Sequence, residues 1–197
     1  MEQAECGFEI LNLQKTTMEN FFLKSKHWKL FLIFFMLMFV SQISFILPRI
    51  NNANHFNGLQ TAVFIGCFLS WFYFLITGLN KRIINENLRS STRYLPFLIA
   101  FPILYVSTAY TIFPGGFQIS TEGKSDADPI WFLIIFPLHL FSMFCIFYLM
   151  YKAAKTIKIA EVQKPVSFGD FAGEFFLLWF FPIGIWILQP KINKLAE

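Results

Sequence analysis

Three side chains in this sequence are of types that could do chemistry in an apolar setting, namely His139, Asp170 and Glu174. The two acids are four residues apart, so on a helix they share one face. The histidine lies near the middle of a long apolar run. A histidine and carboxylates at membrane depth could relay protons or hold a divalent metal, although their spacing matches no known metal motif. These residues form the candidate polar site, and the sequence predicts no cofactor and no established metal site.

Each member of this candidate site also has a structural explanation. The stretch Ser167–Asp170 has the spacing of a capping box, in which the aspartate would bond the backbone at the start of a helix. Glu174 could instead pair with Lys152 or Lys155 at the end of a neighbouring helix. For His139 the alternative is a neutral imidazole bonded to a backbone carbonyl.

The composition indicates that these residues belong to a membrane protein. Of 197 residues, 56% are hydrophobic and only 14% are charged, whereas about a quarter are charged in soluble domains. The net charge of +4 does not indicate nucleic-acid binding, because the Lys and Arg residues form short clusters between apolar runs. Cys6, Cys67 and Cys145 are too widely spaced for a disulfide framework or a metal site. The predicted partner is the lipid bilayer, and nucleic acid is excluded.

Four apolar runs predict an all-α, polytopic transmembrane helix bundle. The expected spans are about 30–47, 59–79, 94–113 and 130–151, within a single transmembrane domain of residues 30–197. Pro102 lies inside the third span, where a kink is expected.

Residues 1–29 are predicted to form a cytoplasmic, amphipathic N-terminal segment. Thr16–Glu19 fits a capping box, so a helix is expected to begin there. Apolar residues before and after this box indicate a segment that lies along the membrane surface or docks a partner. The segment contains acids and is followed by no cleavage site, so the first span is expected to be an uncleaved anchor.

The distribution of Lys and Arg predicts the orientation. Segments 1–29, 80–93 and 152–174 together hold twelve, whereas 48–58 and 114–129 together hold two. Because cytoplasmic loops carry the excess of cations, the N terminus is expected in the cytoplasm.

The closing stretch 168–188 has two possible courses. Its twenty-one residues would extend about 31 Å as a helix, which is enough to cross the hydrocarbon core. Its purely apolar part, Phe175–Leu188, is shorter, and Pro182 and Gly184 supply a bend at its centre. A re-entrant segment that returns to the cytoplasmic side is therefore favoured over a kinked fifth span.

The same stretch carries a resemblance to a known family. Residues 173–193 read GEFFLLWFFPIGIWILQPKIN. The motif FGDFAGEF, residues 168–175, overlaps the start of this stretch. This region, roughly 165–195, resembles the C-terminal segment of an uncharacterised family of small multi-pass membrane proteins from Bacteroidota. The resemblance implies a bacterial inner membrane and supplies no activity and no catalytic residues.

The chain contains no serine elbow, HExxH, phosphate-binding glycine loop or CxxC pair. The leading prediction is therefore a non-enzymatic component that acts by association with a membrane-protein partner or with itself. A small transporter or proton-conducting protein using His139 and Glu174 is the alternative. An intramembrane enzyme is third, and it would require all three candidate side chains within about 5 Å of one another.

Overall fold

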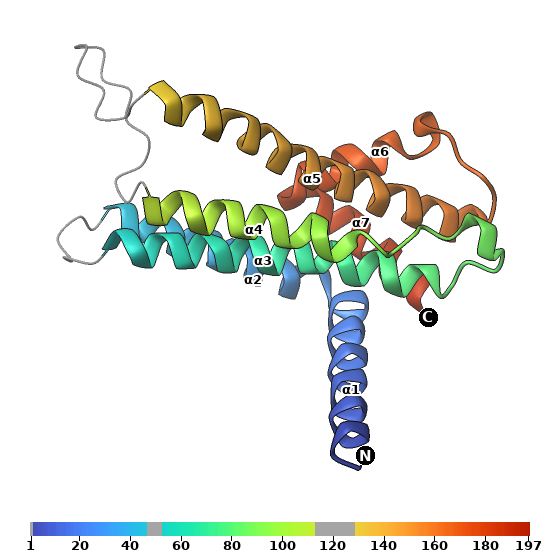
Figure 1. Cartoon of the computed structure of the whole chain (residues 1–197). Coiled ribbons are helices and arrows are strands. Elements are labelled where there is room, and N and C mark those ends of the chain that lie inside the picture. Colours follow the sequence, from blue (N-terminus) through green and yellow to red (C-terminus); the bar gives the residue numbers. More distant parts are fainter. Residues whose placement is uncertain (1, 47–52, 113–128) are drawn as a thin grey trace. The chain divides into compact units, whose positions relative to one another are not determined.

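The computed structural model describes residues 2–46, 53–112 and 129–197, and every regular element in these ranges is helical (Figure 1). The elements are α1 (Glu2–Lys24), α2 (His27–Ile46), α3 (Ala53–Asn80), the 3₁₀ turn η1 (Glu86–Leu88), α4 (Leu95–Ile112), α5 (Pro129–Val162), α6 (Phe168–Trp179) and α7 (Phe181–Ala196). The predicted all-α class is confirmed. Two connections, 48–58 and 114–129, were expected to carry few cations. Most of their residues lie outside the part of the chain that the structure describes.

The chain divides into two compact units. The first unit comprises Met1–Ile33, Trp71–Thr92 and Met150–Glu197, and the second comprises Phe34–Ser70 and Arg93–Leu149. Helices α2, α3 and α5 contribute residues to both.

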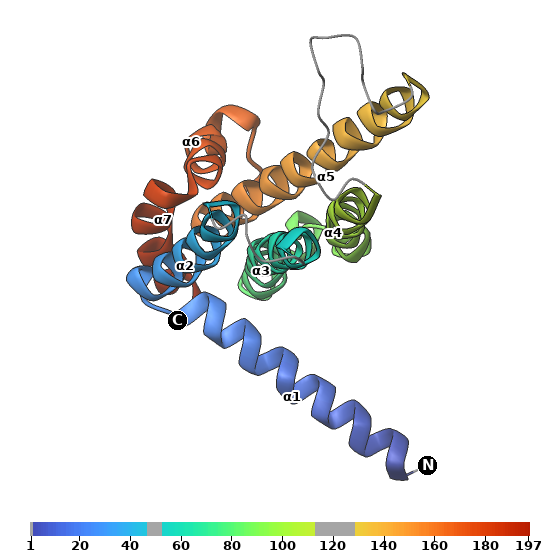
Figure 2. The ribbon, with the colours of Figure 1, turned by 90° about the vertical axis from the view of Figure 1, so that its left-hand side faces the viewer.

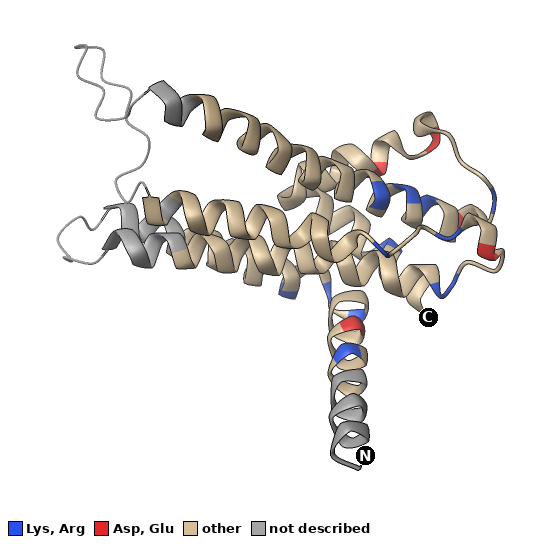
Figure 3. Ribbon diagram, viewed as in Figure 1, with Lys and Arg blue, Asp and Glu red and all other residues tan. Residues whose placement is uncertain are grey.

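Charge separates the two units sharply. Among the residues that the structure describes, Arg93 is the one charged residue of the second unit, and all other Lys, Arg, Asp and Glu residues belong to the first (Figure 3). The described part of the second unit is therefore built almost wholly from uncharged residues.

Two helices in the described part of the chain are long and apolar enough to cross a membrane by length and composition. Their qualifying stretches are Leu59–Asn80 in α3 and Leu133–Val162 in α5. The apolar stretches of α2 and α4, His27–Val40 and Leu95–Ala109, are shorter. Two of the four predicted spans therefore meet this criterion.

Packing in the second unit is dominated by aromatic rings. Phe34 meets Phe68 edge to face, with ring centroids 5.7 Å apart, and Phe101 meets Phe141 in the same way at 4.7 Å. Such edge-to-face pairs place the positive ring edge against the negative ring face. Helix α4 continues through Pro102.

Helix α5 extends well beyond the predicted end at residue 151. It reaches Val162, and Ala153, Ala154, Ile157 and Ala160 are buried along this extension. These positions recur at helical spacing, so the extension has its own apolar stripe. The first lysine after an apolar run is a signal for the end of a membrane span, but it does not end a helix.

Helix α1 also begins earlier than predicted. It starts at Glu2, so the predicted start at the Thr16–Glu19 capping box is wrong. The Thr17 hydroxyl donates to the Leu13 carbonyl 2.8 Å away, which is a bond made inside a helix. The Glu19 carboxylate accepts two hydrogen bonds from Lys81, at 2.7 and 2.8 Å, in place of a capping bond.

Candidate functional site

The closing stretch of the chain forms a helical hairpin in the first unit. Helix α6 ends at Trp179, Phe180 adopts φ −86° and ψ 55°, and α7 begins at the next residue. The N–H groups of Ile183 and Gly184 donate to the Phe180 carbonyl, at 3.0 and 2.8 Å, which starts the new helix. Pro182 lies in the first turn, where its missing N–H is not needed. Both views show α6 and α7 side by side (Figures 1 and 2), so residues 168–188 are bent rather than one straight helix.

Gly184 allows the two helices of this hairpin to pack closely. A Cβ atom at this position would lie 1.7 Å from the Leu177 carbonyl oxygen and 2.5 Å from its carbonyl carbon. These are backbone atoms of α6, which cannot rotate away as a flexible side chain could. The glycine is therefore a requirement of the hairpin itself.

Asp170 forms the predicted capping box. Its carboxylate accepts hydrogen bonds from the Ser167 backbone N–H at 2.7 Å and from the Ser167 hydroxyl at 2.8 Å. Ser167 has extended backbone angles, as expected of a residue just before a helix. These two hydrogen bonds lower the pKa of the Asp170 carboxyl below its ordinary value. Asp170 thus starts α6, and this contact accounts for its position.

Glu174 is buried and belongs to a group of two acids and two lysines. Lys191 Nζ on α7 lies 2.8 Å from a Glu174 carboxylate oxygen and 2.8 Å from one of Glu161 on α5. Lys158 lies 2.8 Å from Glu161 and 3.8 Å from Glu174. We call these four residues the α5–α7 ion cluster. Its formal charges cancel, and it joins α5, α6 and α7.

The predicted partners of Glu174 were wrong. Lys152 donates to the Ser91 carbonyl at 2.7 Å, whereas Glu174 forms ion pairs with Lys158 and Lys191. Two features of the fold explain the change. Helix α5 continues past residue 151 and carries Lys158 to the level of the acid, and the hairpin returns Lys191 from the far end of α7.

The C-terminal part of α7 clamps the junction between α1 and α2. The side-chain amide of Gln189, which is fully buried, donates to the Phe22 carbonyl at 2.8 Å. Asn193 donates to the Ser25 carbonyl at 3.2 Å. Both acceptors lie at the end of α1, where backbone carbonyls lack partners within the helix. The clamp was not predicted from the sequence, although Gln189, an amide directly after an apolar run, is its visible signal.

Arg82 adds a second attachment of α7 within the first unit. Its guanidinium donates to the backbone carbonyls of Ala196 and Glu197, the latter at 3.2 Å. The end of α7 is therefore held both at the α1–α2 junction and at the loop that follows α3.

His139 belongs to the second unit, whereas Asp170 and Glu174 belong to the first. His139 Nδ1 lies 3.3 Å from the Tyr105 hydroxyl on α4, and the imidazole is exposed. The described partner is thus a phenol rather than the backbone carbonyl expected from the sequence. Tyr105 was not singled out by the sequence, because only the packing of α4 on α5 brings it to the histidine.

No group of three or more His, Cys, Asp or Glu side chains is arranged to hold a metal ion within residues 2–46, 53–112 and 129–197. Comparison of the chain with family models, with curated proteins and with solved structures finds no match. The resemblance of residues 165–195 to a Bacteroidota family therefore stays a prediction.

Proposed function

We propose that this chain is a multi-pass protein of a bacterial inner membrane and acts without catalysis, by associating with a membrane-protein partner or with a second copy of itself. In this proposal α2, α3, α4 and α5 span the membrane. The α6–α7 hairpin is a re-entrant element that enters the cytoplasmic leaflet and returns. The contact surface is the exposed apolar face of that hairpin.

The helix lengths support four spans. At 1.5 Å per residue, the 20 residues of α2 extend about 30 Å and the 18 residues of α4 about 27 Å. The qualifying stretches of α3 and α5 are longer, at 22 and 30 residues. All four helices are therefore long enough for a hydrocarbon core of about 30 Å, and α5 extends beyond it. A single charged residue in the described second unit is also what a lipid-embedded bundle requires.

The cation distribution supports a cytoplasmic first unit. Lys29, Arg93 and Lys152 each lie at one end of an apolar helix stretch, in α2, just before α4 and in α5, as cations at a headgroup interface would. The remaining described cations belong to the first unit. By the positive-inside rule, α1, α6 and α7 are then on the cytoplasmic side.

The length of the hairpin suits one leaflet. Phe180, at its tip, is six residues beyond Glu174, which corresponds to about 9 Å along α6. A leaflet contributes about 15 Å of hydrocarbon. The tip can therefore lie in acyl chains while the α5–α7 ion cluster stays at headgroup level.

The proposed function rests on a contrast within the hairpin. Its two acids are paired, whereas several of its apolar side chains are exposed. Asp170 and Glu174 already have partners in the capping box and the ion cluster. By contrast, Trp179, Phe180 and Ile183 are 50, 60 and 63% exposed. Apolar patches of this kind mark membrane or protein contact sites. The chemistry of the hairpin is thus better suited to contact than to proton transfer or catalysis.

Crosslinking in native membranes tests the proposal. The full chain carrying a photoreactive residue at Ile187 on the exposed face should yield a discrete crosslinked species, either a dimer or one partner band. Replacing Ile183 by Ser should reduce this yield, since it removes apolar contact area from the same face. Replacing Lys194 by Gln, which alters an exposed residue of α7 at its polar end, should not. Recovery of monomer alone, with the wild-type hairpin inserted, would overturn the proposal.

The Tyr105–His139 pair favours a second candidate function, proton conduction or transport. A phenol and an imidazole in hydrogen-bond contact can pass a proton between them. In that case His139→Ala and Glu174→Ala would each remove a proton flux in reconstituted vesicles while expression stayed intact. The ion pair between Glu174 and Lys191 makes this function less well supported than association.

A further inference from the structure

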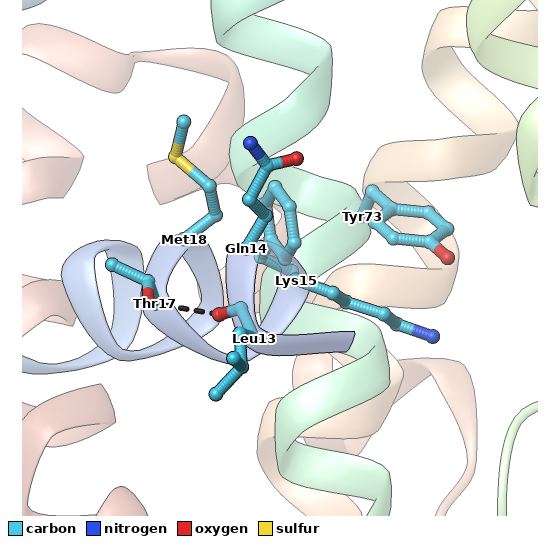
Figure 4. A pocket seen from close by; sticks show the side chains of 7 residues that line it. Leu13, Gln14, Lys15, Thr17, Met18 and Tyr73 are labelled. Atoms are coloured by element: carbon cyan, nitrogen blue, oxygen red, sulfur yellow. Dashed lines mark hydrogen bonds between the residues drawn. The ribbon is translucent and has the colours of Figure 1, made fainter. Parts of the chain in front are cut away.

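A groove in the first unit lies between α1 and the C-terminal part of α3 (Figure 4). Its volume is about 610 Å³, and it is lined by Leu13, Gln14, Lys15, Thr17, Met18, Tyr73 and Phe74. All of these residues belong to one compact unit. The groove is therefore a feature of a single packed body.

One part of the groove is apolar and uncovered. Leu13 and Met18 on α1 are 68 and 53% exposed, and Phe74 on α3 is half-buried. Phe74 is held in place by Phe22, whose ring stacks on it with centroids 5.4 Å apart. These side chains offer an apolar surface to a flexible hydrocarbon chain.

The rim of the groove is cationic. Lys15 and Tyr73 extend toward the same side of α1, with the ammonium and the phenol hydroxyl at their outer ends (Figure 4). Glu19, one turn after Lys15, would be its usual helical partner, but its carboxylate is bonded to Lys81 instead. None of the ion pairs between described residues involves Lys15. The rim thus has a positive charge and a hydroxyl donor available to an anion.

We propose that this groove binds one anionic phospholipid. Its phosphate lies between Lys15 and Tyr73, and one acyl chain lies along Leu13, Met18 and Phe74. A cation beside an apolar trough matches the charge and shape of such a lipid, whereas a second protein copy would have to supply an acidic group beside an apolar one. The lipid would hold α1 along the membrane surface. The inference rests on the membrane location in the proposed function, but not on the association activity.

Lipid binding to the purified full chain tests this site directly. After delipidation in mild detergent, native mass spectrometry is used to titrate dioleoyl phosphatidylglycerol and dioleoyl phosphatidylcholine, which share acyl chains but differ in net charge. We expect one phosphatidylglycerol to bind more tightly than phosphatidylcholine. Lys15→Gln should weaken phosphatidylglycerol binding about fivefold, as expected for one lysine at an anionic lipid surface, and should leave phosphatidylcholine unchanged.

Two further variants separate the head and the tail of the lipid. Met18→Ser should weaken binding of both lipids, because it removes apolar contact without changing charge. Lys194→Gln is the matched control, since it removes an exposed lysine of the same unit outside the groove, and it should bind like wild type. Circular dichroism confirms that each variant keeps its helix content.

Three results would overturn the lipid site. These are equal affinity of the wild type for the two lipids, equal loss on Lys15→Gln and Lys194→Gln, and a change of oligomeric state on Met18→Ser without loss of lipid. The last would assign the groove to a protein partner. A wild type that binds the lipid but gives no crosslink through Ile187 would instead overturn only the association proposal.

Discussion

Replacing Gly184 by Ala should disrupt the α6–α7 hairpin. The new Cβ atom would lie 1.7 Å from the Leu177 carbonyl oxygen, whereas real Cβ contacts stay above 3.0 Å. The two helices must therefore separate by about 1.3 Å or more at this point. No dihedral strain contributes, because alanine is well suited to a helical backbone.

The loss of folding free energy follows from the type of atom that the new Cβ would contact, which is a backbone atom. Overpacking in a close-packed interior costs about 1–3 kcal/mol, and a clash with backbone belongs at the upper end. At about 3 kcal/mol the unfolding equilibrium constant rises roughly 150-fold, and for a chain of this size the melting temperature falls by roughly 6–12 °C.

Thermal unfolding in detergent and hydrogen exchange of the hairpin amides would measure this effect. Gly173→Ala is the matched control, because a Cβ there meets nothing within 4 Å. It lies inside the same hairpin and should be neutral or stabilising by up to about 1 kcal/mol. Equal melting temperatures for the two variants, with unchanged exchange around residue 184, would refute the close packing of α6 on α7.

Three further outcomes are expected. Lys191→Met should destabilise the chain by about 2 kcal/mol in thermal unfolding, and more than Glu174→Gln, since it leaves two carboxylates with Lys158 alone between them; the reverse order would contradict the ion cluster. Gln189→Ala should cost about 1–3 kcal/mol and speed hydrogen exchange at the α1–α2 junction, because the part-buried Phe22 carbonyl loses its donor; unchanged exchange would argue against the clamp. The Asp170 cap should stabilise α6 fully above the ordinary pKa of the carboxyl, and this stabilisation should be lost as pH falls through the lowered pKa of the folded chain. Hydrogen exchange of the α6 amides should therefore speed up in acid, and Asp170→Asn should remove this pH dependence. A pH dependence that survives the substitution would contradict the capping role.

Local patterns predicted several elements well. The apolar runs placed α2, α3 and α4 to within a few residues, apart from the start of α3, and the serine and aspartate at 167 and 170 predicted the start of α6. Pro182 and Gly184 predicted the bend of the closing stretch. Each of these features depends on residues within one or two turns of a helix.

Other expectations failed where a distant residue intervened. Thr16–Glu19 has the spacing of a capping box, but Glu19 bonds Lys81, which is 62 positions away. The fourth span was predicted to end at residue 151, just before Lys152, but α5 continues because its later residues pack inside the first unit. A local signal was overridden in each case by burial or by a charge from elsewhere in the chain.

By itself, the sequence determined the all-helical class, the positions of most helices and the capping role of Asp170, because apolar periodicity and capping act over a few residues. Only the tertiary structure decided the partners of the other candidate residues. Glu174 meets Lys191 across 17 positions, His139 meets Tyr105 across 34, and Gln189 reaches Phe22 across 167. Many lysines and carbonyls are chemically equivalent as partners, and only the folded path of the chain selects among them.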